Sequence, residues 1–294
     1  MRISILFPAV VFSLLAFSSC QSDRDAEPIP INQTEAQDAA NMIEASWSGR
    51  NAFANSYDQV DYQAQQEGDL NGFTTTNDDH RPPSSCAAVS FIADPDNFWP
   101  AVLTLDYDQG CINELGQNLS GIITATFDGL LLTEGTNINV DFDAFSINAY
   151  AVDGTYSVRN DGLNGAGQRN FTHRIDNGQL QQNGTTILTY EAVENHVQTE
   201  GQETNFFTDG LSGILDDVFE ETVNANGTGA LGNSFTITTL EPLTRPVFCS
   251  KPVSGKLQYD FAIFDQSAIL DFGNGSCDDF ATVTIGTYSF TIRI

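Results

Sequence analysis

The chain has 294 residues, of which 39 are Asp or Glu and only 11 are Lys or Arg, so its formal net charge is −28. Such an excess of negative charge argues against nucleic acids and anionic membrane surfaces as partners, because both would repel the chain. Apolar residues make up 40% of the sequence, which is enough to build a core and argues against global disorder.

The N-terminus has the pattern of an export signal. Arg2 precedes an apolar stretch over 3–17 that is too short and too close to the terminus for a spanning helix. We therefore expect residues 1–19 to be a signal peptide. Cys20 follows two small serines, an arrangement that resembles a bacterial lipobox, in which the cysteine is lipidated and anchors the mature protein to a membrane. The alternative is an ordinary secretory peptide followed by a stray cysteine.

The next segments predict a tether and then a helical region. Residues 20–33 are polar, contain proline and show no apolar period, so we expect a tether. The acidic run at its start resembles the signal that sends Bacteroidota lipoproteins to the outer cell face, and a solvated linker is the alternative. Residues 34–67 carry apolar residues at helical spacing. They predict one or two helices, broken near Ser48 and Gly49, with a loop over 68–85.

From residue 86 to 294 the apolar period changes to two, which predicts a single antiparallel β domain. Predicted strands do not alternate with predicted helices, so we expect no parallel sheet. The fold class is therefore mainly β: an antiparallel meander that forms a curved sheet, a sandwich or an open barrel, with an N-terminal helical segment. Strands are expected at 120–127, 138–152, 186–193 and 234–240, with hairpin turns at Asp265-Gln266 and Gly286.

Four cysteines remain once the lipobox cysteine is set aside, and an even number favours disulfides in an exported protein. Local pairing of Cys86 with Cys111 and of Cys249 with Cys277 closes loops of similar length, and it is one of three possible connectivities. A zinc site is the competing interpretation. It is disfavoured because no two of these cysteines have CxxC spacing and no histidine lies near them in the sequence.

Two segments near the ends of the β domain share a pattern. In LDYDQGC (105–111) and LDFGNGSC (270–277) a strand runs into an acidic, glycine-containing turn that stops at cysteine. Strands that begin with Ser-Gly lie close by, at 120 and 254. We infer two related Cys-containing units, although the order of strand and turn is reversed between them. Two independent turns of similar chemistry are the alternative.

The lipobox, CSKPVSGKL (249–257) and LDFGNGSCDDFATVTI (270–285) together resemble a family of Bacteroidota lipoproteins of the Flavobacteria type. Members of this family carry a C-terminal LD[FY]GxGxCD motif followed by a final β-hairpin. The resemblance covers mainly residues 86–127 and 247–294, and it implies a place in the cell envelope but no activity. Asp279 departs from the pattern, which has Asn at this position.

The sequence offers few candidates for catalysis. Its histidines are His80, His173 and His196, and no nucleophile elbow, zinc-protease or nucleotide-binding motif accompanies them. Glu194 and His196 would share one strand face and could act together or bind a metal. We interpret this face as solvated. Acidic pairs such as Asp216-Asp217 are frequent in so acidic a chain and identify no glycosidase dyad. We therefore expect no catalytic residues and no enzyme.

Acidic turns offer the clustered oxygen ligands that calcium prefers. The weak candidates for such a site are Asp271, Asp278 and Asp279, and turns that simply face water are the alternative. We expect no other cofactor.

Taken together, these features predict an outer membrane lipoprotein of the cell envelope, exposed to the periplasm or on the cell surface. Its expected role is non-catalytic binding or a structural task, with a protein, a glycan or a lipid as partner. One alternative is a carrier of a lipid or another hydrophobic ligand in the cavity of a curved sheet. Another is a glycan-acting enzyme, which requires a cleft that holds a carboxylate of raised pKa.

Overall fold

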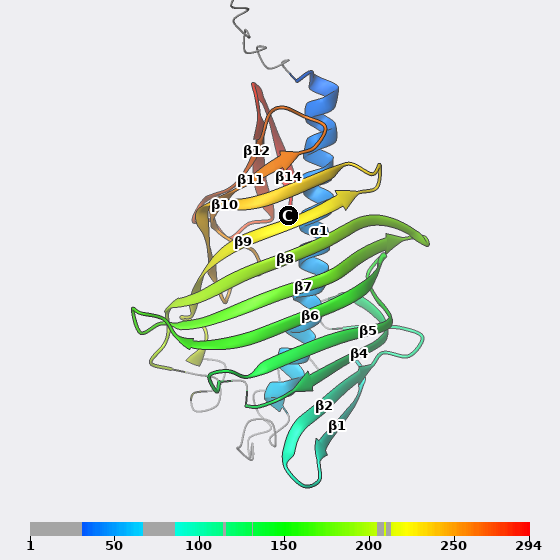
Figure 1. Ribbon diagram of the computed structural model, residues 1–294, viewed down its shortest axis with the longest axis vertical. Coiled ribbons are helices and arrows are strands. Elements are labelled where there is room, and N and C mark those ends of the chain that lie inside the picture. Colours follow the sequence, from blue (N-terminus) through cyan, green and yellow to red (C-terminus); the bar gives the residue numbers. More distant parts are fainter. Residues whose placement is uncertain (1–30, 67–85, 114–115, 131, 205–208, 210–212) are drawn as a thin grey trace, which may run out of the picture.

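The computed structural model describes residues 31–294 apart from 67–85, 114–115, 131, 205–208 and 210–212. The predicted signal peptide, Cys20, most of the tether and the predicted loop over 68–85 lie outside the described residues. The fold consists of one long helix and one large antiparallel sheet (Figure 1).

Helix α1 (Gln33–Gln66) is continuous, so the predicted break near Ser48 and Gly49 is wrong. Its first turn is closed by a capping box, in which the backbone N–H of Glu35 donates to the side chain of Asn32 and the Asn32 N–H donates to the Glu35 carboxylate. Gly49 has a packing role, because a Cβ at this position would collide with the Leu188 side chain. The missing side chain lets the helix approach the sheet closely.

The strands follow one another as a meander in which every neighbouring pair is antiparallel. The prediction of a mainly β, antiparallel fold with an N-terminal helix is confirmed. The sheet is open, since β1 and β14 lie at its two ends, and β3 pairs only with β4. The strands are β1 (Ala88–Asp94), β2 (Phe98–Asp106), β3 (Cys111–Ile112), β4 (Asn118–Phe127), β5 (Asn137–Ile147), β6 (Tyr150–Leu163), β7 (Arg169–Gln182), β8 (Thr185–Glu200), β9 (Val218–Gly229), β10 (Ser234–Pro246), β11 (Ser254–Phe261), β12 (Ala268–Asn274), β13 (Phe280–Ile285) and β14 (Tyr288–Arg293).

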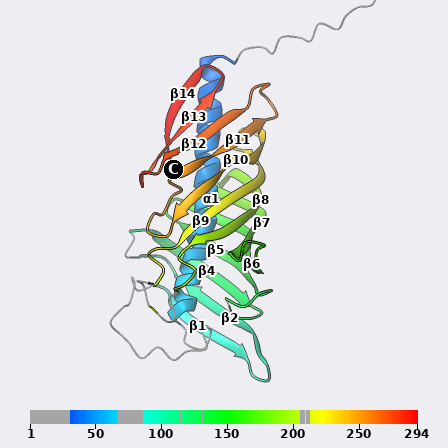
Figure 2. The same ribbon diagram turned by 90° about the vertical axis from the view of Figure 1, so that its left-hand side faces the viewer.

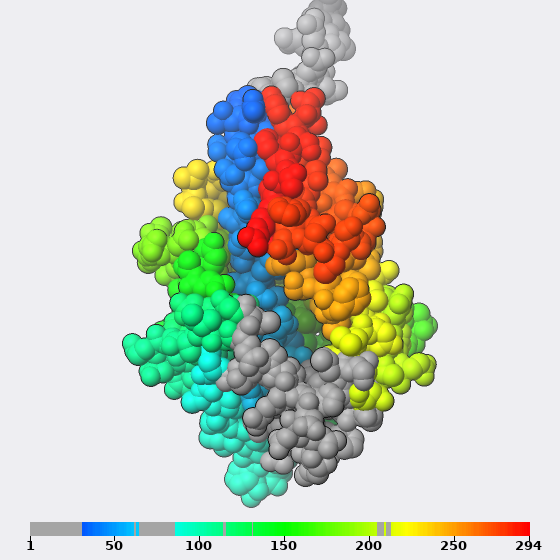
Figure 3. Space-filling view, turned by 180° about the vertical axis from the view of Figure 1, so that it is seen from behind, coloured from blue at the N-terminus to red at the C-terminus, as the bar shows by residue number. Residues whose placement is uncertain are grey.

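The sheet curves around the helix, so that α1 lies along its concave face and crosses strands from β2 to β14 (Figure 2). Figure 3, seen from behind, shows α1 in blue between the N-terminal strands in green and the C-terminal strands in orange and red. Trp47 and Phe53 of the helix are fully buried, and Trp47 packs on Phe272 with 4.8 Å between ring centroids. The core is therefore the layer between one helix and the inner side chains of the whole sheet.

The segment predicted as one strand over 138–152 is two strands, β5 and β6. The chain turns at Asn148, which has a φ of 55°, in the left-handed region that Asn tolerates. Ile147 and Val152 both face the core although they are five positions apart, whereas residues an odd number apart in one strand face opposite sides. The alternation of inward and outward residues therefore changes phase at this turn. That change could have been detected in the sequence.

Both predicted disulfides are present, Cys86–Cys111 and Cys249–Cys277. The two segments that contain them are also alike in their strand pairing. In each, the residue after Ser-Gly lies opposite the aspartate of the turn strand, Ile122 opposite Asp106 and Lys256 opposite Asp271. An antiparallel pair has the same geometry whichever strand comes first, so the reversed order in the sequence does not alter the unit.

Candidate functional site

A cavity of about 520 Å³ lies between α1 and the inner face of the sheet, mainly over β6–β10. This volume is within the range of small-molecule sites. The helix contributes one stripe of side chains at helical spacing, and each strand contributes alternate residues. The side chains discussed below come from α1 (Arg50, Asn55, Tyr57, Asp58, Asp61), β6 (Tyr156), β7 (Arg169, His173), β8 (Glu194, His196, Gln198), the β8–β9 connection (Asp217), β9 (Phe219, Glu221) and β10 (Arg245).

The inner end of the cavity is a network of buried ion pairs. Arg50 donates through Nε and Nη2 to both oxygens of Glu194, at 2.8 and 2.5 Å, and through Nη2 to Glu221 Oε2 at 2.7 Å. The other oxygen of Glu221 accepts a short hydrogen bond from Arg245 Nε. Two guanidinium groups thus balance two carboxylates, which is how buried charges are tolerated.

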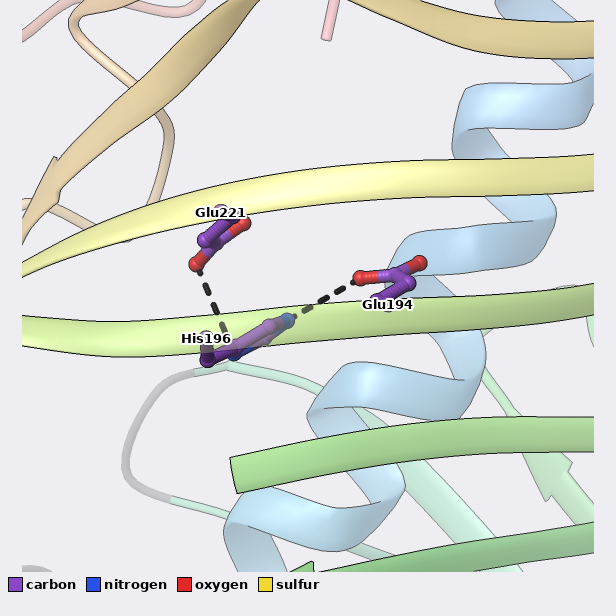
Figure 4. Close-up of side chains that lie close together, drawn as sticks. All are labelled: Glu194, His196 and Glu221. Carbon is purple, nitrogen blue, oxygen red and sulfur yellow. Dashed lines mark hydrogen bonds and ion pairs between the residues drawn. The ribbon is translucent and has the colours of Figure 1, made fainter. Parts of the chain in front are cut away.

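His196 lies between the two carboxylates (Figure 4). Its Nε2 is 3.1 Å from Glu194 Oε2, and its Nδ1 is 3.8 Å from Glu221 Oε1. A carboxylate can only accept a hydrogen bond, so Nε2 carries a proton and donates it to Glu194. Cross-strand pairing sets this geometry, because His196 lies directly opposite Glu221 in the β8–β9 register.

Both carboxylates are ionised at neutral pH. Burial alone would raise the pKa of Glu194, but the Arg50 charge and the hydrogen bonds from His196 and Arg50 outweigh it and lower that pKa. Burial likewise opposes ionisation of Glu221, and the charges of Arg245, His196 and Arg50 hold its pKa well below the usual value. Neither group can act as a general acid at neutral pH.

Glu194, His196 and Glu221 are the one group in the described part of the chain with ligand atoms close enough for a metal, all within 4.8 Å of one another. The two arginines make this a poor metal site. A divalent cation about 4 Å from one guanidinium would be repelled by roughly 8 kcal/mol at an effective dielectric constant of about 20. We therefore interpret the group as an ion-pair network whose cationic positions the arginines fill.

A second arrangement extends the network along the sheet. His173 stacks on His196 with 3.8 Å between ring centroids and an interplanar angle of 14°, and its Nδ1 is 2.6 Å from the Tyr156 hydroxyl. Burial lowers the pKa of His173 well below the usual value, and the neighbouring His196 lowers it further. His173 is therefore neutral near pH 7. Tyr57 of α1 packs against both Tyr156 and His173, which gives the cavity an aromatic wall.

Three further carboxylates, those of Asp58, Asp61 and Asp217, line the cavity outside the network. The Asp58 side chain is open to the cavity. The surrounding protein removes part of its water and so raises its pKa, while the charge of Arg245 opposes this shift. Burial also raises the pKa of Asp217 to about 6, against the hydrogen bond that Gln198 Nε2 donates at 2.9 Å.

The predicted solvated face of Glu194 and His196 is wrong. The two residues do share a strand face, but that face is turned toward α1, and they are only 5% and 6% exposed. Of the calcium candidates, Asp271 and Asp278 line one small pocket of about 210 Å³, and the three aspartates do not form a group of metal ligands within the described residues. Asp271 accepts from the Gly273 N–H and Asp278 from the Phe280 N–H, while Asp279 pairs with Arg293. His80 lies outside the described residues.

Arg50, Glu221 and Arg245 were not among the predicted site residues. A signal was present at the last two positions. Glu221 lies an even number of positions from the buried residues Val223 and Ala225, so it faces the same side of the sheet as they do. Arg245 is related to the buried Leu243 in the same way. A charged residue at an inward position of a strand requires a buried partner, and this requirement could have identified the network.

No protein-family model matches this chain, and comparisons with curated proteins and with solved structures likewise gave no match. Among the described residues, no helix is both long enough and apolar enough to cross a bilayer.

Proposed function

We propose that this protein is a cell-envelope lipoprotein that binds a small molecule, without transforming it, between α1 and strands β6–β10. The observation that carries the proposal is the cavity of about 520 Å³, in which polar groups from one helix and five strands converge. Such a combination of volume and converging polar groups is typical of binding sites. Regular elements hold these side chains in place, which favours recognition over a purely structural role.

The chemistry of the inner network favours binding over catalysis. Its two carboxylates are ionised and already accept hydrogen bonds from arginines. A general acid or a nucleophile needs a reactive group that is free to exchange a proton with a substrate. The network offers a fixed surface of donors, acceptors and aromatic rings instead.

The envelope location is the part of the proposal that rests on the N-terminal sequence. Lipidation of Cys20 would anchor the domain to the outer membrane, and the acidic residues after it would favour the cell surface. Radioactive palmitate should label the wild-type protein in its native host and should not label Cys20→Ala. Equal labelling of the two proteins would contradict the anchor.

Native and denaturing mass spectrometry of the domain purified from its native host tests the binding proposal. We expect the native mass to exceed the denatured mass by one small molecule. Ala54→Trp should abolish that difference by filling the cavity, because Ala54 is part of the cavity wall. Ala151→Trp, on the exposed face of β6, should retain it. Equal native and denatured masses for the wild type would overturn the proposal.

A glycan-acting enzyme is the second candidate function, favoured by the raised pKa of Asp58 and by that of Asp217 at about 6. A carboxyl group of raised pKa keeps its proton to a higher pH, and a protonated carboxyl group can donate that proton to a glycosidic oxygen. Incubation with neutral oligosaccharides separates the two functions. Products that wild type releases and Asp217→Asn does not would favour the enzyme, and intact oligosaccharides would favour binding alone.

A further inference from the structure

We infer that the ligand of this cavity is a neutral polyhydroxylated molecule, such as a saccharide, held between Asn55 and Asp58 of α1 and Arg245 of β10. This inference rests on the proposed binding function and adds the chemical class of the ligand.

Two polar side chains of α1 line the cavity without a partner among the described residues. Within the described part of the chain, no residue makes a hydrogen bond or an ion pair with the side chains of Asn55 and Asp58, although both line the cavity. They are three positions apart, so they are neighbours on one helix face. Together they present an amide, which both donates and accepts, beside a carboxylate, which accepts.

Arg245 of β10 lies on the opposite wall of the cavity. Arg245 uses Nε for Glu221, and its two Nη groups donate to no other described residue, while its side chain is 28% exposed. Arg245 and Asp58 are close enough for each charge to shift the pKa of the other, yet no ion pair within 4 Å joins them. A donor surface and an acceptor surface therefore face each other across a gap that a ligand can bridge.

An acyl chain would fit this gap poorly. Covering the Asp58 carboxylate or the free guanidinium N–H groups with methylenes removes their water and offers no hydrogen bond in exchange. An unpaired polar group buried in this way costs roughly 1–3 kcal/mol, and a charged one costs more. A buried methylene contributes only about 0.8 kcal/mol, so several methylenes would be needed to offset each group.

Simple ions are also poorly matched. An anion near Arg245 and Arg169 would meet the charges of Asp58 and Asp61, and a cation near these aspartates would meet the two arginines. A hydroxyl group suits both walls, because it donates to a carboxylate and accepts from a guanidinium. Neighbouring hydroxyls can engage both oxygens of Asp58 or both Nη groups of Arg245. Tyr57 supplies a ring that lines the cavity and against which the C–H face of a sugar can pack.

The test is isothermal titration calorimetry of the mature protein with four probes: maltose, cellobiose, sodium oleate and glutamine. We expect a neutral disaccharide to bind and oleate to give no heat. Asp58→Leu and Asn55→Leu should each weaken disaccharide binding at least tenfold. Asp38→Leu is the matched control on an exposed position of the same helix and should bind as wild type does. Circular dichroism should show the same helix content in all variants.

Binding of oleate alone, or of glutamine alone, would overturn the saccharide inference and leave the binding function standing. Disaccharide binding that Asp58→Leu and Asp38→Leu weaken equally would overturn the assigned site. If none of the probes binds, the ligand mass from native spectrometry decides. An added mass of hexose units supports the inference, and any other added mass overturns it. No added mass overturns the binding function as well.

Discussion

Arg50 is the residue on which the buried charge network depends. Its guanidinium group binds both Glu194 and Glu221 and lies 4.7 Å above the centroid of the Trp47 ring. Removing one partner from a buried ionic network leaves the other charges without compensation, which typically costs about 3–5 kcal/mol. We therefore expect Arg50→Met to lower the free energy of unfolding by about that amount, measured by urea denaturation.

Arg174→Met provides the control for this substitution, because Arg174 is exposed and pairs with Asp176 at the surface. We expect no measurable change in stability, as is usual for exposed ion pairs. Equal losses for the two variants would contradict the central role of Arg50.

His173 should make stability depend on pH. Burial holds its pKa well below 6.5, and the groups around it are His196, Glu221, Arg245 and Arg50. In the unfolded chain the imidazole takes up a proton as the pH falls through 6.5, whereas in the folded protein it stays neutral to a much lower pH. Acidification therefore favours unfolding below pH 6.5, by up to about 1.4 kcal/mol per pH unit.

The measurement compares wild type with His173→Phe, because groups present in both proteins, such as Asp217, then cancel. The stability of wild type relative to the variant should decrease between pH 6.5 and 5, and the difference should be constant between pH 7.5 and 8.5. A constant difference over the whole range would show that His173 titrates normally.

At the scale of elements, two glycines fix the bulges at which the Ser-Gly strands pass their neighbours. Gly121 and Gly255 have φ values of 79° and 108°, and a Cβ at either position would collide with the backbone of the adjacent strand. Gly232, in the β9–β10 turn, has a similar φ of 81° and open space around it. The three positions therefore separate the cost of an unusual φ from the cost of a collision.

We expect Gly232→Ala to lower the free energy of unfolding by about 1–2 kcal/mol, the cost of a left-handed backbone for a residue with a Cβ. Gly121→Ala and Gly255→Ala should lose roughly 1–3 kcal/mol more, because the backbone must shift to make room. Urea denaturation of the three variants provides the measurement. If all three lose the same amount, the close approach of the strands has no energetic consequence.

The elements differ in how far the sequence predicts them. The alternation of apolar residues with polar, solvent-facing residues predicts β11 to β14 well, because these strands carry few polar residues toward the core. It fails in β8, where only 186–193 was predicted, since Glu194, His196 and Gln198 occupy inward positions. The helix break was expected from Gly49, whose role is visible only when Leu188 is placed beside it. Long-range partners account for both errors.

At the scale of the whole molecule, the two disulfides close loops at different places in the sheet. They join residues 25 and 28 positions apart, and each should contribute about 3–4 kcal/mol by restricting the unfolded chain. The double variants Cys86→Ser/Cys111→Ser and Cys249→Ser/Cys277→Ser should each lose that amount in urea denaturation. Because they share no contacts, the losses should add to within about 0.5 kcal/mol in the fourfold variant.

Wild type in excess dithiothreitol serves as the control and should match the fourfold variant. A loss that appears with only one pair would mean that the other bond leaves the unfolded state unrestricted.

These pairings were predictable because four cysteines in two close pairs leave few alternatives. The site was not, because its residues come from one helix and five strands whose meeting depends on the curvature of the sheet.

The position of α1 in the trough of the sheet also has a consequence for how the protein is made. Synthesis delivers the N-terminal helix first, yet its buried face is covered by strands up to β14, at the other end of the chain. A single helix is marginal in water without such packing. Most of the core must therefore wait for contacts between distant parts of the sequence, which makes folding slow. During that interval the apolar side chains of Trp47 and Phe53 are exposed to water, so we expect the newly made chain to bind chaperones.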